Sequence, residues 1–550
     1  MTQIDPAGLI TDDWQINGAV YTDDAVFRTE MDQVFRQVWL YVAHESQLRN
    51  PGDYLTTYAG TQPVIVSRGR DDDEIHVMLN RCRHRGATVC QAESGNANFF
   101  RCAYHGWTYT NSGGLRGVTY DQGYEKLDRD ALGLVRVARV ETYAGFVFAN
   151  FSPEGPSLSE YLGHAAPYLD LVAQQGPEGI RIDAGAHHLQ YDGNWKLQVE
   201  NTIDNYHFGF VHRSFLEVLT DRIGSPPPII RNILQDDTWR TIDLGNGHSV
   251  HEFGDPANGN NGGQLGDLPF NLIVFPNLCF VGAQLRHVLP LQANRTQVRL
   301  YPMLHEGLSD EENAAILRTH EGFYGPAGMG GADDVEIAFD RVSDGMRATE
   351  HDWLIMSRGL HREQPTGDGR RRAAAARLLP RLAGGDGGGR LVSAAAVELS
   401  FEVADFLYRE AALLDTEQYD AWLSLCAEDI AYSIPQGTPD PLRRVGIAND
   451  DHRRLTERVI RLNSGFAYSQ EPRSKVVHVV GNVRVLAQDG DVVTVASTQV
   501  IAEVRRGRQN LYTGLVEHDL RRVGAGFEIA RKELRLASSE LPLGNLTFLL

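Results

Sequence analysis

The sequence predicts a multidomain α+β protein in which an all-β unit is inserted into an α+β unit with an antiparallel sheet, and a second α+β unit follows. Three observations predict this fold class. A chain of 550 residues is too long for one hydrophobic core. Short runs rich in Val, Ile, Phe and Tyr alternate with clusters of Gly, Pro, Asn and Asp in residues 39–152. Longer β-rich runs separated by short polar turns lie near the end of the chain.

The first predicted element is an amphipathic helix within residues 1–38. Phe27, Met31, Val34 and Phe35 recur at spacings of three and four between positions 21 and 38. We expect residues 1–38 to form the N-terminal helical part of the unit that resumes at residue 153.

The period of the sequence changes after this helix. In residues 39–152 the runs PVIVSR, IHVMLN and AGFVFANF have the length and composition of strands, which indicates a small all-β domain. In residues 153–364 helical and strand patterns mix, as in NLIVFPNLCFVGAQLRHVLPL and TQVRLYPML. We therefore expect an antiparallel sheet with helices packed on it.

Composition changes again at residues 365–390. This stretch, PTGDGRRRAAAARLLPRLAGGDGGGR, has almost no apolar periodicity, which predicts a linker. Residues 391–550 then begin with a helical pattern in VADFLYREAALLD and a short helix near 419–425. Four β-rich runs predict a meander of long antiparallel strands: KVVHVVGNVRVLA, DVVTVASTQVIAEVRR, NLYTGLVEHDLRRV and GFEIARKELRL.

Composition also limits the classes of function. The formal charge of -20 disfavours nucleic acid and anionic membrane as partners, because both reward basic surface. No run approaches the roughly 18 apolar residues of a membrane span. The stretch MTQIDPAGLITDDW has acids where a signal peptide has basic residues. Five scattered cysteines argue against a disulfide framework, so we expect a cytoplasmic protein with free thiols.

Two Cys/His pairs form the first candidate site. NRCRHRG contains Cys82 and His84, and FRCAYHGW contains Cys102 and His105, so each loop supplies one thiolate and one imidazole. A structural zinc site more often takes its cysteines from one knuckle and its histidines from another element. A Rieske cluster needs two Cys on one iron and two His on the other. The spacing therefore favours a two-iron cluster, with zinc as the alternative.

A one-electron relay needs a terminal acceptor, and NWKLQVENTIDNYHFGFVHRSF offers one. Helical spacing places an apolar and a polar set of side chains on adjacent faces of one helix. The apolar face has Trp195, Val199, Ile203, Tyr206 and Phe210, and the polar face has Glu200, Asp204 and His207. His212 lies about 140° further round an ideal helix than His207, so the imidazoles converge only if the helix ends or distorts between them. We expect Gly209 to permit this.

Two histidines and one carboxylate with open coordination positions form the facial triad of non-haem iron oxygenases. The alternative is that His207 and His212 are core histidines with satisfied hydrogen bonds. The carboxylate must come from elsewhere in the chain. FYGPAGMGGADDVEIAFDRV offers Asp333 and Asp334 after a Gly-rich turn where a helix begins, and one of them could serve only as a helix cap.

The motifs C-x-H…C-x-x-H and E-x-x-x-D-x-x-H-x-x-x-x-H together resemble those of the Rieske non-haem iron aromatic-ring-hydroxylating dioxygenases. Residues from about 20 to 360 resemble the large, catalytic α subunit. The resemblance implies one Rieske 2Fe-2S cluster held by Cys82, His84, Cys102 and His105, and one mononuclear Fe(II) held by His207, His212 and Asp334. It also implies that Asp204 joins His207 to the cluster histidine His105 of a neighbouring subunit. Asn201 matches a polar residue near the iron.

Residues 391–550 resemble the small β subunit of the same enzymes, which has a cone-shaped α+β (NTF2-like) fold and is largely structural. Family members make the two subunits as separate chains, and the α subunit normally continues with helical sequence beyond His361. Here RRRAAAARLLPRLAGGDGGG stands in its place. A natural fusion, an engineered fusion and a frameshifted join each account for this. The family's three α and three β subunits would become a trimer of fused chains.

The resemblance implies a terminal oxygenase that cis-dihydroxylates an arene with O2. The electrons would come from an NAD(P)H-dependent reductase, with or without a ferredoxin between them. LYVAHESQLRNPGDYLTTYAGTQPVIVSR and YDGNWKLQVEN look most like the branch that acts on benzoate and related aromatic carboxylates. The alternatives are a Rieske monooxygenase or demethylase, a catalytically impaired fusion, and a zinc-stabilised assembly protein without redox activity.

Overall fold

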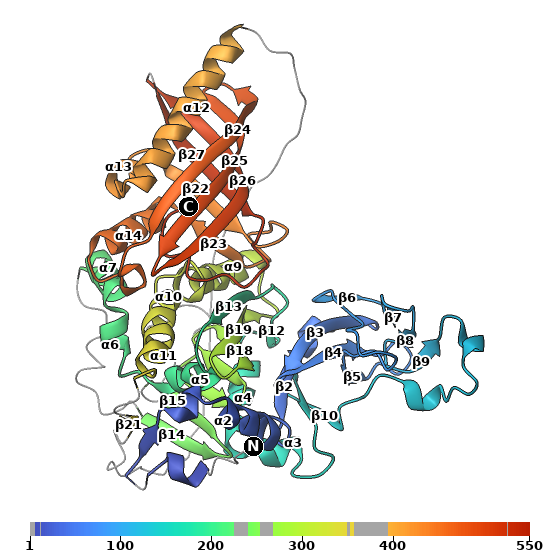
Figure 1. Ribbon diagram of the computed structural model, residues 1–550. Coiled ribbons are helices and arrows are strands. Elements are labelled where there is room, and N and C mark those ends of the chain that lie inside the picture. The colour runs from blue at the N-terminus through green and yellow to red at the C-terminus, as the bar shows by residue number, and fades with distance from the viewer. Residues whose placement is uncertain are drawn as a thin grey trace.

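The computed structural model describes residues 6–11, 13–224, 240–253, 268–348, 352–356, 394–524 and 526–550. Three parts follow one another along the chain: a blue all-β unit that projects to one side, a green and yellow α+β unit, and an orange and red unit at the C-terminus (Figure 1). This is the predicted fold class, which is confirmed. The predicted linker at 365–390 lies outside the described residues.

The N-terminal helix predicted for residues 21–38 is divided into shorter pieces. These are α1 (Ala19–Thr22), α2 (Asp24–Glu30) and the π-helix η2 (Met31–Phe35), after η1 (Pro6–Leu9) and strand β1 (Gln15–Asn17). The prediction of one continuous helix was wrong at Asp23, whose backbone is extended. Its carboxylate caps α2 by accepting hydrogen bonds from the backbone N–H of Ala25 and Val26.

The all-β unit is built from three small sheets. A four-stranded sheet has the order β5-β4-β3-β6, and two three-stranded sheets have the orders β7-β8-β9 and β10-β11-β2. The strands are β2 (Leu40–His44), β3 (Asp53–Ala59), β4 (Gln62–Arg68), β5 (Ile75–Leu79), β6 (Ser94–Asn96), β7 (Phe99–Arg101), β8 (Thr108–Thr110), β9 (Leu115–Gly117), β10 (Arg139–Tyr143) and β11 (Phe146–Asn150), with 3-10 turns at η3 (Glu45–Gln47), η4 (Asp121–Gly123) and η5 (Asp130–Leu132). One Cys/His loop follows β5 and the other joins β7 to β8, so strand ends hold both loops.

The middle unit contains a seven-stranded antiparallel sheet with the order β13-β19-β18-β17-β16-β15-β14. Its strands are β13 (His187–Tyr191), β14 (Arg240–Gly245), β15 (His248–Glu252), β16 (Phe270–Val274), β17 (Leu278–Val281), β18 (Gln284–Gln292) and β19 (Arg295–Pro302); β12 (Ile180–Arg181) pairs with β20 (Leu304–His305), and β21 (Trp353–Ile355) with β1. Helix α5 (Trp195–Ile203) packs against strands β15 to β18 of this sheet.

The other helices of the middle unit surround α5 and the sheet. They are α3 (Leu158–Leu162), η6 (Gly163–Ala165), α4 (Ala166–Ala173), α6 (Phe208–Val211), α7 (Arg213–Ile223), α9 (Asp310–Thr319), η8 (His320–Tyr324), α10 (Gly331–Asp334), η9 (Val335–Arg341) and α11 (Val342–Gly345). Side chains of α2 and η2 share one hydrophobic core with α5, η9 and the sheet. The N-terminal helices therefore pack with this unit.

The C-terminal unit contains a six-stranded sheet with the order β23-β22-β27-β26-β25-β24, in which only the β22–β27 pair is parallel. The strands are β22 (Cys426–Pro435), β23 (Gly446–Asp450), β24 (Lys475–Asp489), β25 (Val492–Arg505), β26 (Arg508–Val523) and β27 (Gly526–Leu536), and the helices are α12 (Ala394–Asp415), α13 (Tyr419–Leu423), α14 (His452–Asn463) and η10 (Tyr468–Gln470). Helix α12 lies along the sheet (Figure 1). The predicted antiparallel meander is confirmed in β24 to β27.

The C-terminal unit also contacts the middle unit closely. Gly446 donates its backbone N–H to Glu321, and the ring of His187 donates from Nε2 to the Gly446 carbonyl at 2.8 Å.

Among the helices that the structure describes, none combines the length and the apolar character needed to cross a bilayer.

Two fully buried histidines make stability depend on pH. Burial lowers the pKa of His187 to about 4 and that of His287 to about 3. The unfolded chain therefore takes up protons below about pH 6.5 that the folded protein excludes, so stability is present above that pH and is lost as the pH falls. Between pH 6.5 and 5, unfolding in urea followed by circular dichroism should show a loss whose slope rises towards about 1.4 kcal/mol per pH unit for each histidine.

A pair of variants separates this effect from general acid sensitivity. The ring of His287 packs edge-on against Tyr41 at 5.1 Å, so His287→Phe keeps a ring contact and removes the titration. The variant should lose stability less steeply between pH 6.5 and 5 than the wild type, whereas His164→Gln, at an exposed position, should follow the wild type. Equal slopes for His287→Phe and the wild type would refute the assignment.

Candidate metal centres

The two Cys/His loops have the same backbone geometry. Gly86 donates its N–H to the Cys82 carbonyl and Gly106 donates to the Cys102 carbonyl, both at 3.0 Å. The cysteine N–H groups in turn donate to Ala87 and Trp107, both at 2.8 Å. Gly86 and Gly106 have φ of 77° and 72°, a conformation that side chains disfavour. Each glycine therefore lets its loop turn back sharply after the cysteine.

The predicted ligands of these loops face one another. The rings of His84 and His105 lie 4.6 Å apart between centroids, and Trp107 stacks on His84 at 5.1 Å. The Nδ1 atoms of both histidines are buried without a hydrogen-bond partner, and Cys82 and Cys102 are buried free thiols. Two orphaned imidazole nitrogens beside two buried thiols are the donors that a Rieske cluster requires.

The geometry argues against zinc at these loops. Tetrahedral zinc would hold four donors at about 2.0–2.3 Å, and so roughly 3–4 Å from one another. Among the described His, Cys, Asp and Glu residues, one group brings three ligand atoms within 4.8 Å of each other, and it includes none of these four residues. Donors spread more widely suit a cluster that has its cysteines on one iron and its histidines on the other.

The group that does converge consists of His207, His212 and Asp334. Asp334 Oδ1 lies 3.3 Å from His207 Nε2 and 3.2 Å from His212 Nε2. Ligands at neighbouring positions of an octahedral ion with bonds near 2.1 Å are about 3 Å apart. The Nε2 atoms of both histidines converge on Asp334 Oδ1, and His212 and Asp334 are buried, so these residues fit a facial triad.

The helix interruption between the two histidines lies at His212 and not at Gly209. Helix α6 begins after His207 and ends before His212, whose φ of -95° and ψ of 25° are not helical, and α7 begins at Arg213. The expectation for Gly209 was wrong, because this residue lies inside α6. A separate break precedes both histidines: α5 ends at Ile203, and the Asp204 carboxylate accepts a hydrogen bond from the Tyr206 N–H at 2.9 Å.

The same break overturns the predicted helical face. Tyr206 and Phe210 were expected to share a face with Trp195, which is buried. Instead Tyr206 is 55% exposed and Phe210 is 66% exposed, since the helical register is lost between α5 and α6.

Charge and burial oppose each other at the triad. Burial alone would lower the pKa of His207, but hydrogen bonds and charges from Asp204 and Asp334 raise it to about 10. Burial would raise the pKa of Asp334, but His212 and His207 hold it far below its usual range. The site therefore favours an ionised carboxylate, which demands positive charge beside it.

Asp333 and Asp334 point to different partners. Asp334 faces the two histidines, whereas Asp333 Oδ1 accepts hydrogen bonds from Arg461 Nη2 at 2.7 Å and from the Ser469 N–H at 3.0 Å. Neither acid caps the helix, because the N-cap of α10 is Gly330. The choice that the sequence left open between the two acids is thus made by their surroundings.

Asn201 and Asp204 lie beside the triad. Asn201 Nδ2 is 3.4 Å from Asp334 Oδ1 and 3.5 Å from His207 Nε2. Asp204 Oδ2 is 3.3 Å from His207 Nδ1, and half of the Asp204 side chain is exposed. Asp204 can therefore fix the His207 ring from the side that faces solvent.

Sequence reasoning missed the aromatic residues around His212. Phe208 and Phe323 pack on the His212 ring at 5.0 Å and 5.6 Å between centroids, and Phe215 packs on Phe323. No spacing rule links Phe323 to His212, since the two are far apart in the chain. The Gly-rich turn that precedes Asp333 and Asp334 does have a local cause. A Cβ at Gly331 would lie 2.7 Å from the Tyr324 carbonyl oxygen, so a side chain there would clash.

Comparison with protein families matches three parts of the chain. Residues 38–128 match the Rieske [2Fe-2S] domain, residues 181–365 the ring hydroxylating alpha subunit (catalytic domain), and residues 409–542 the ring hydroxylating beta subunit. The first two ranges contain the two candidate metal centres.

Similar proteins include the large subunit of 2-halobenzoate 1,2-dioxygenase from Burkholderia cepacia, 32% identical over 62% of this chain and 79% of that protein. The alpha subunit of toluate 1,2-dioxygenase from Pseudomonas putida is 33% identical over 58% of this chain and 76% of its own length. Among solved structures, naphthalene 1,2-dioxygenase from Rhodococcus sp. bound to indole matches with a TM-score of 0.57 and 27% identity, covering 65% of this chain and 89% of that one.

Proposed function

The chain belongs to the Rieske non-haem iron aromatic-ring-hydroxylating dioxygenases, and from this premise we propose that it is a terminal oxygenase with its α and β subunits fused. As a member it is an oxidoreductase with a Rieske 2Fe-2S cluster and a mononuclear iron. The observation that carries the proposal is the buried His207–His212–Asp334 group, in the same chain as two matched Cys/His loops.

We assign Cys82, His84, Cys102 and His105 to the cluster, and His207, His212 and Asp334 to the iron. When bound, the cluster relays single electrons and the ferrous iron activates O2 for addition to an arene. Tyr109 would hold the proposed cluster ligand Cys82 in place, because its hydroxyl lies 3.2 Å from Cys82 Sγ and accepts a hydrogen bond from the Arg83 N–H.

The residues around the triad orient its ligands and exclude water. Asp204 holds the Nδ1 face of His207, which leaves Nε2 for the iron. Asn201 is placed to hold the carboxylate oxygen of Asp334. Phe208 and Phe323 cover the ring of His212 with apolar surface, so that this ligand is shielded from bulk solvent.

We further propose that electrons pass between chains in a homotrimer. In Figure 1 strands β7 to β9, which flank the second Cys/His loop, lie at the far end of the blue unit, well away from α5 and α6. Tyr104, next to His105, is 59% exposed, and the exposed Tyr206 and Phe210 flank His207. A second copy of the chain would cover these aromatics and bring His105 to the Asp204 of its neighbour.

For the substrate we propose an aromatic carboxylate, since the relatives named for halobenzoate, toluate and anthranilate each match across most of their length. The expected product is a cis-dihydrodiol, which takes up both atoms of O2, two electrons and two protons. The electrons come from an NADH-dependent reductase, with or without a ferredoxin, and free cysteines support a cytoplasmic location.

We retain the domain boundaries as part of the proposal. Residues 39–152 form the Rieske domain, 1–38 and 153–364 the catalytic domain, and 391–550 the β-subunit domain. Residues 365–390 join the last two.

The proposal is tested by turnover with isotope-labelled O2. Anaerobically prepared protein with a matched reductase should convert at least one member of a panel of benzoates, phthalates and unsubstituted arenes to a diol that carries two labelled atoms. One labelled atom would indicate a monooxygenase. A colourless protein that holds zinc and lacks a Rieske electron paramagnetic resonance (EPR) signal would overturn the assignment altogether.

An Asp204→Asn variant tests the route of the electrons. It should keep both metal centres, because Asp204 binds neither, and should slow electron transfer from the reduced cluster to the iron by up to about 100-fold. Rapid-mixing absorbance of the cluster in a single turnover measures this rate. Glu217→Gln is the matched control, since this acid lies on α7 and pairs with Arg213. Cluster oxidation at the wild-type rate in Asp204→Asn would contradict the bridging role.

A further inference from the structure

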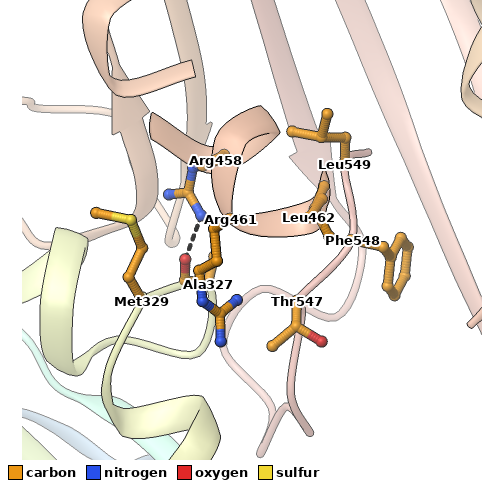
Figure 2. A pocket seen from close by; sticks show the side chains of 8 residues that line it. All are labelled: Ala327, Met329, Arg458, Arg461, Leu462, Thr547, Phe548 and Leu549. Carbon is orange, nitrogen blue, oxygen red and sulfur yellow. Dashed lines mark hydrogen bonds between the residues drawn. The ribbon is translucent and has the colours of Figure 1, made fainter. Parts of the chain in front are cut away.

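The C-terminal domain holds the segment that carries Asp334. The backbone carbonyl of Pro326 accepts a hydrogen bond from the Leu546 N–H at 3.0 Å, and that of Ala332 accepts from Asn545 Nδ2 at 3.0 Å. Arg458 donates to the carbonyl of Ala327, as Figure 2 shows. Every one of these donors belongs to the β-subunit domain.

Arg461 on α14 is the centre of this contact. Its Nη2 lies 2.7 Å from Asp333 Oδ1, and the same nitrogen is 2.8 Å from Ser469 Oγ. Its Nε donates to Ser214 Oγ at 3.1 Å. Asp333 precedes Asp334, and Ser214 follows His212 by two residues on α7. One guanidinium therefore joins the two segments that supply two of the three proposed iron ligands.

Burial makes this guanidinium hard to replace. The side chain of Arg461 is 5% exposed, Asp333 is fully buried, and Ser214 is fully buried too. Removal of the arginine would leave a buried carboxylate without its counter-charge. A lysine carries the charge but lacks the planar fork that reaches Asp333 and Ser214 together.

Arg461 also lines a small cavity at this interface. The cavity beside Arg461, lined by Ala327, Met329, Leu462, Thr547 and Phe548 among others, has a volume of about 10 Å³ (Figure 2). This is space for about one water molecule, so the cavity is not a ligand site. Glu336, two residues after Asp334, also pairs with the C-terminal domain, since Arg505 Nη2 lies 2.9 Å from Glu336 Oε2.

We propose that Arg461 is a positioning residue for the mononuclear iron, through which the β-subunit domain sets the spacing of Asp334 and His212. The inference rests on the proposed function, because it takes His207, His212 and Asp334 as the iron ligands. It assigns the β-subunit domain a direct effect on iron affinity. The ligands of the Rieske cluster lie on other elements and are unaffected.

The test is the affinity of the full-length chain for Fe(II). After removal of the mononuclear iron with a chelator under anaerobic conditions, Fe(II) is titrated back and the intensity of the Rieske EPR signal per chain serves as the control for folding. Arg461→Met should bind Fe(II) about 10–100-fold more weakly than the wild type at unchanged cluster content. Arg461→Lys should recover part of the loss.

Arg454→Met is the matched control. Arg454 lies on the same helix and donates to the Arg318 carbonyl, which belongs to α9 of the catalytic domain and to neither ligand segment. The Fe(II) affinity of the Arg454→Met variant should equal that of the wild type. If Arg461→Met fails to fold, the milder Asp333→Asn and Ser214→Ala decide, because each removes one partner of the guanidinium; both should weaken Fe(II) binding.

Wild-type affinity in Arg461→Met, or in both milder variants, overturns the inference. Failure of the proposed function looks different. In that case His212→Ala would bind Fe(II) as well as the wild type does, which would show that the triad is not the iron site.

Discussion

An Asp334→Ala variant is expected to lose the mononuclear iron and all measurable oxygenation, while the Rieske EPR signal per chain stays at its wild-type intensity. Asp334 is the only carboxylate among the three converging side chains. Its Oδ1 lies within 3.3 Å of the Nε2 atoms of His207 and His212. Two neutral imidazoles cannot neutralise a ferrous ion. The loss should therefore exceed the roughly 10–100-fold effect of residues that only support metal ligands.

Metal analysis and product formation check this prediction together. The wild type should hold three irons per chain, two in the cluster and one at the triad, and the variant two. Asp344→Asn is a suitable control, since this acid lies on the nearby α11 but is mostly exposed and pairs with Arg347. A variant at position 334 that keeps its third iron and turns over would show that the carboxylate ligand lies elsewhere.

The cluster site could be predicted from the sequence because its determinants are local. Each loop spans only a few residues, its glycine is required by the backbone, and the cysteine and histidine lie two or three positions apart. The long strands of the C-terminal domain were predictable for a similar reason. In β25, which is rich in Val, buried and half-buried positions alternate along the strand, as the pleat of a β-strand requires.

The iron site was only partly predictable, because one of its determinants is distant in sequence. Asp334 lies 133 positions beyond Asn201, and only the folded chain shows that Asp334 rather than Asp333 faces the histidines. The Asp333 side chain is turned away by Arg461, which is 128 positions further along the chain. No periodicity links these residues. The family resemblance pointed to Asp334, and tertiary packing explains why Asp334, and not Asp333, faces the histidines.

The position of the helix break was wrong for a different reason. Gly209 was chosen because glycine tolerates unusual backbone conformations, yet it lies inside the short helix α6. The helix is interrupted instead at His212, where α6 ends and α7 begins, and before both histidines at Asp204, which can form local hydrogen bonds with the backbone and so compete with the helix. Asp204 is also the residue for which we propose an electron-transfer role. It therefore both caps the end of α5 and contacts His207.

Replacement of Lys532 by methionine should destabilise the C-terminal domain more than any surface substitution. Lys532 on β27 and Glu410 on α12 are both buried and pair at 2.8 Å. Trp422 and His518 also contact the Glu410 carboxylate, at 3.4 Å and 3.3 Å. Burial would raise the pKa of Glu410, but the charge of Lys532 and the contact with His518 hold it far below its usual range.

Lys532→Met leaves this carboxylate buried without its main counter-charge, at a cost of about 3–5 kcal/mol. Hydrogen exchange of the β26 and β27 amides in the full-length chain, measured by mass spectrometry, should accelerate by at least about 100-fold. Exposed Arg535→Met on the same strand should change the exchange little. The double variant Lys532→Met with Glu410→Leu should regain most of the protection, because a buried pair replaced by apolar side chains leaves no charge unpaired. If the double variant exchanged as fast as the single one, lost packing of the lysine chain, and not the stranded carboxylate, would be the cause.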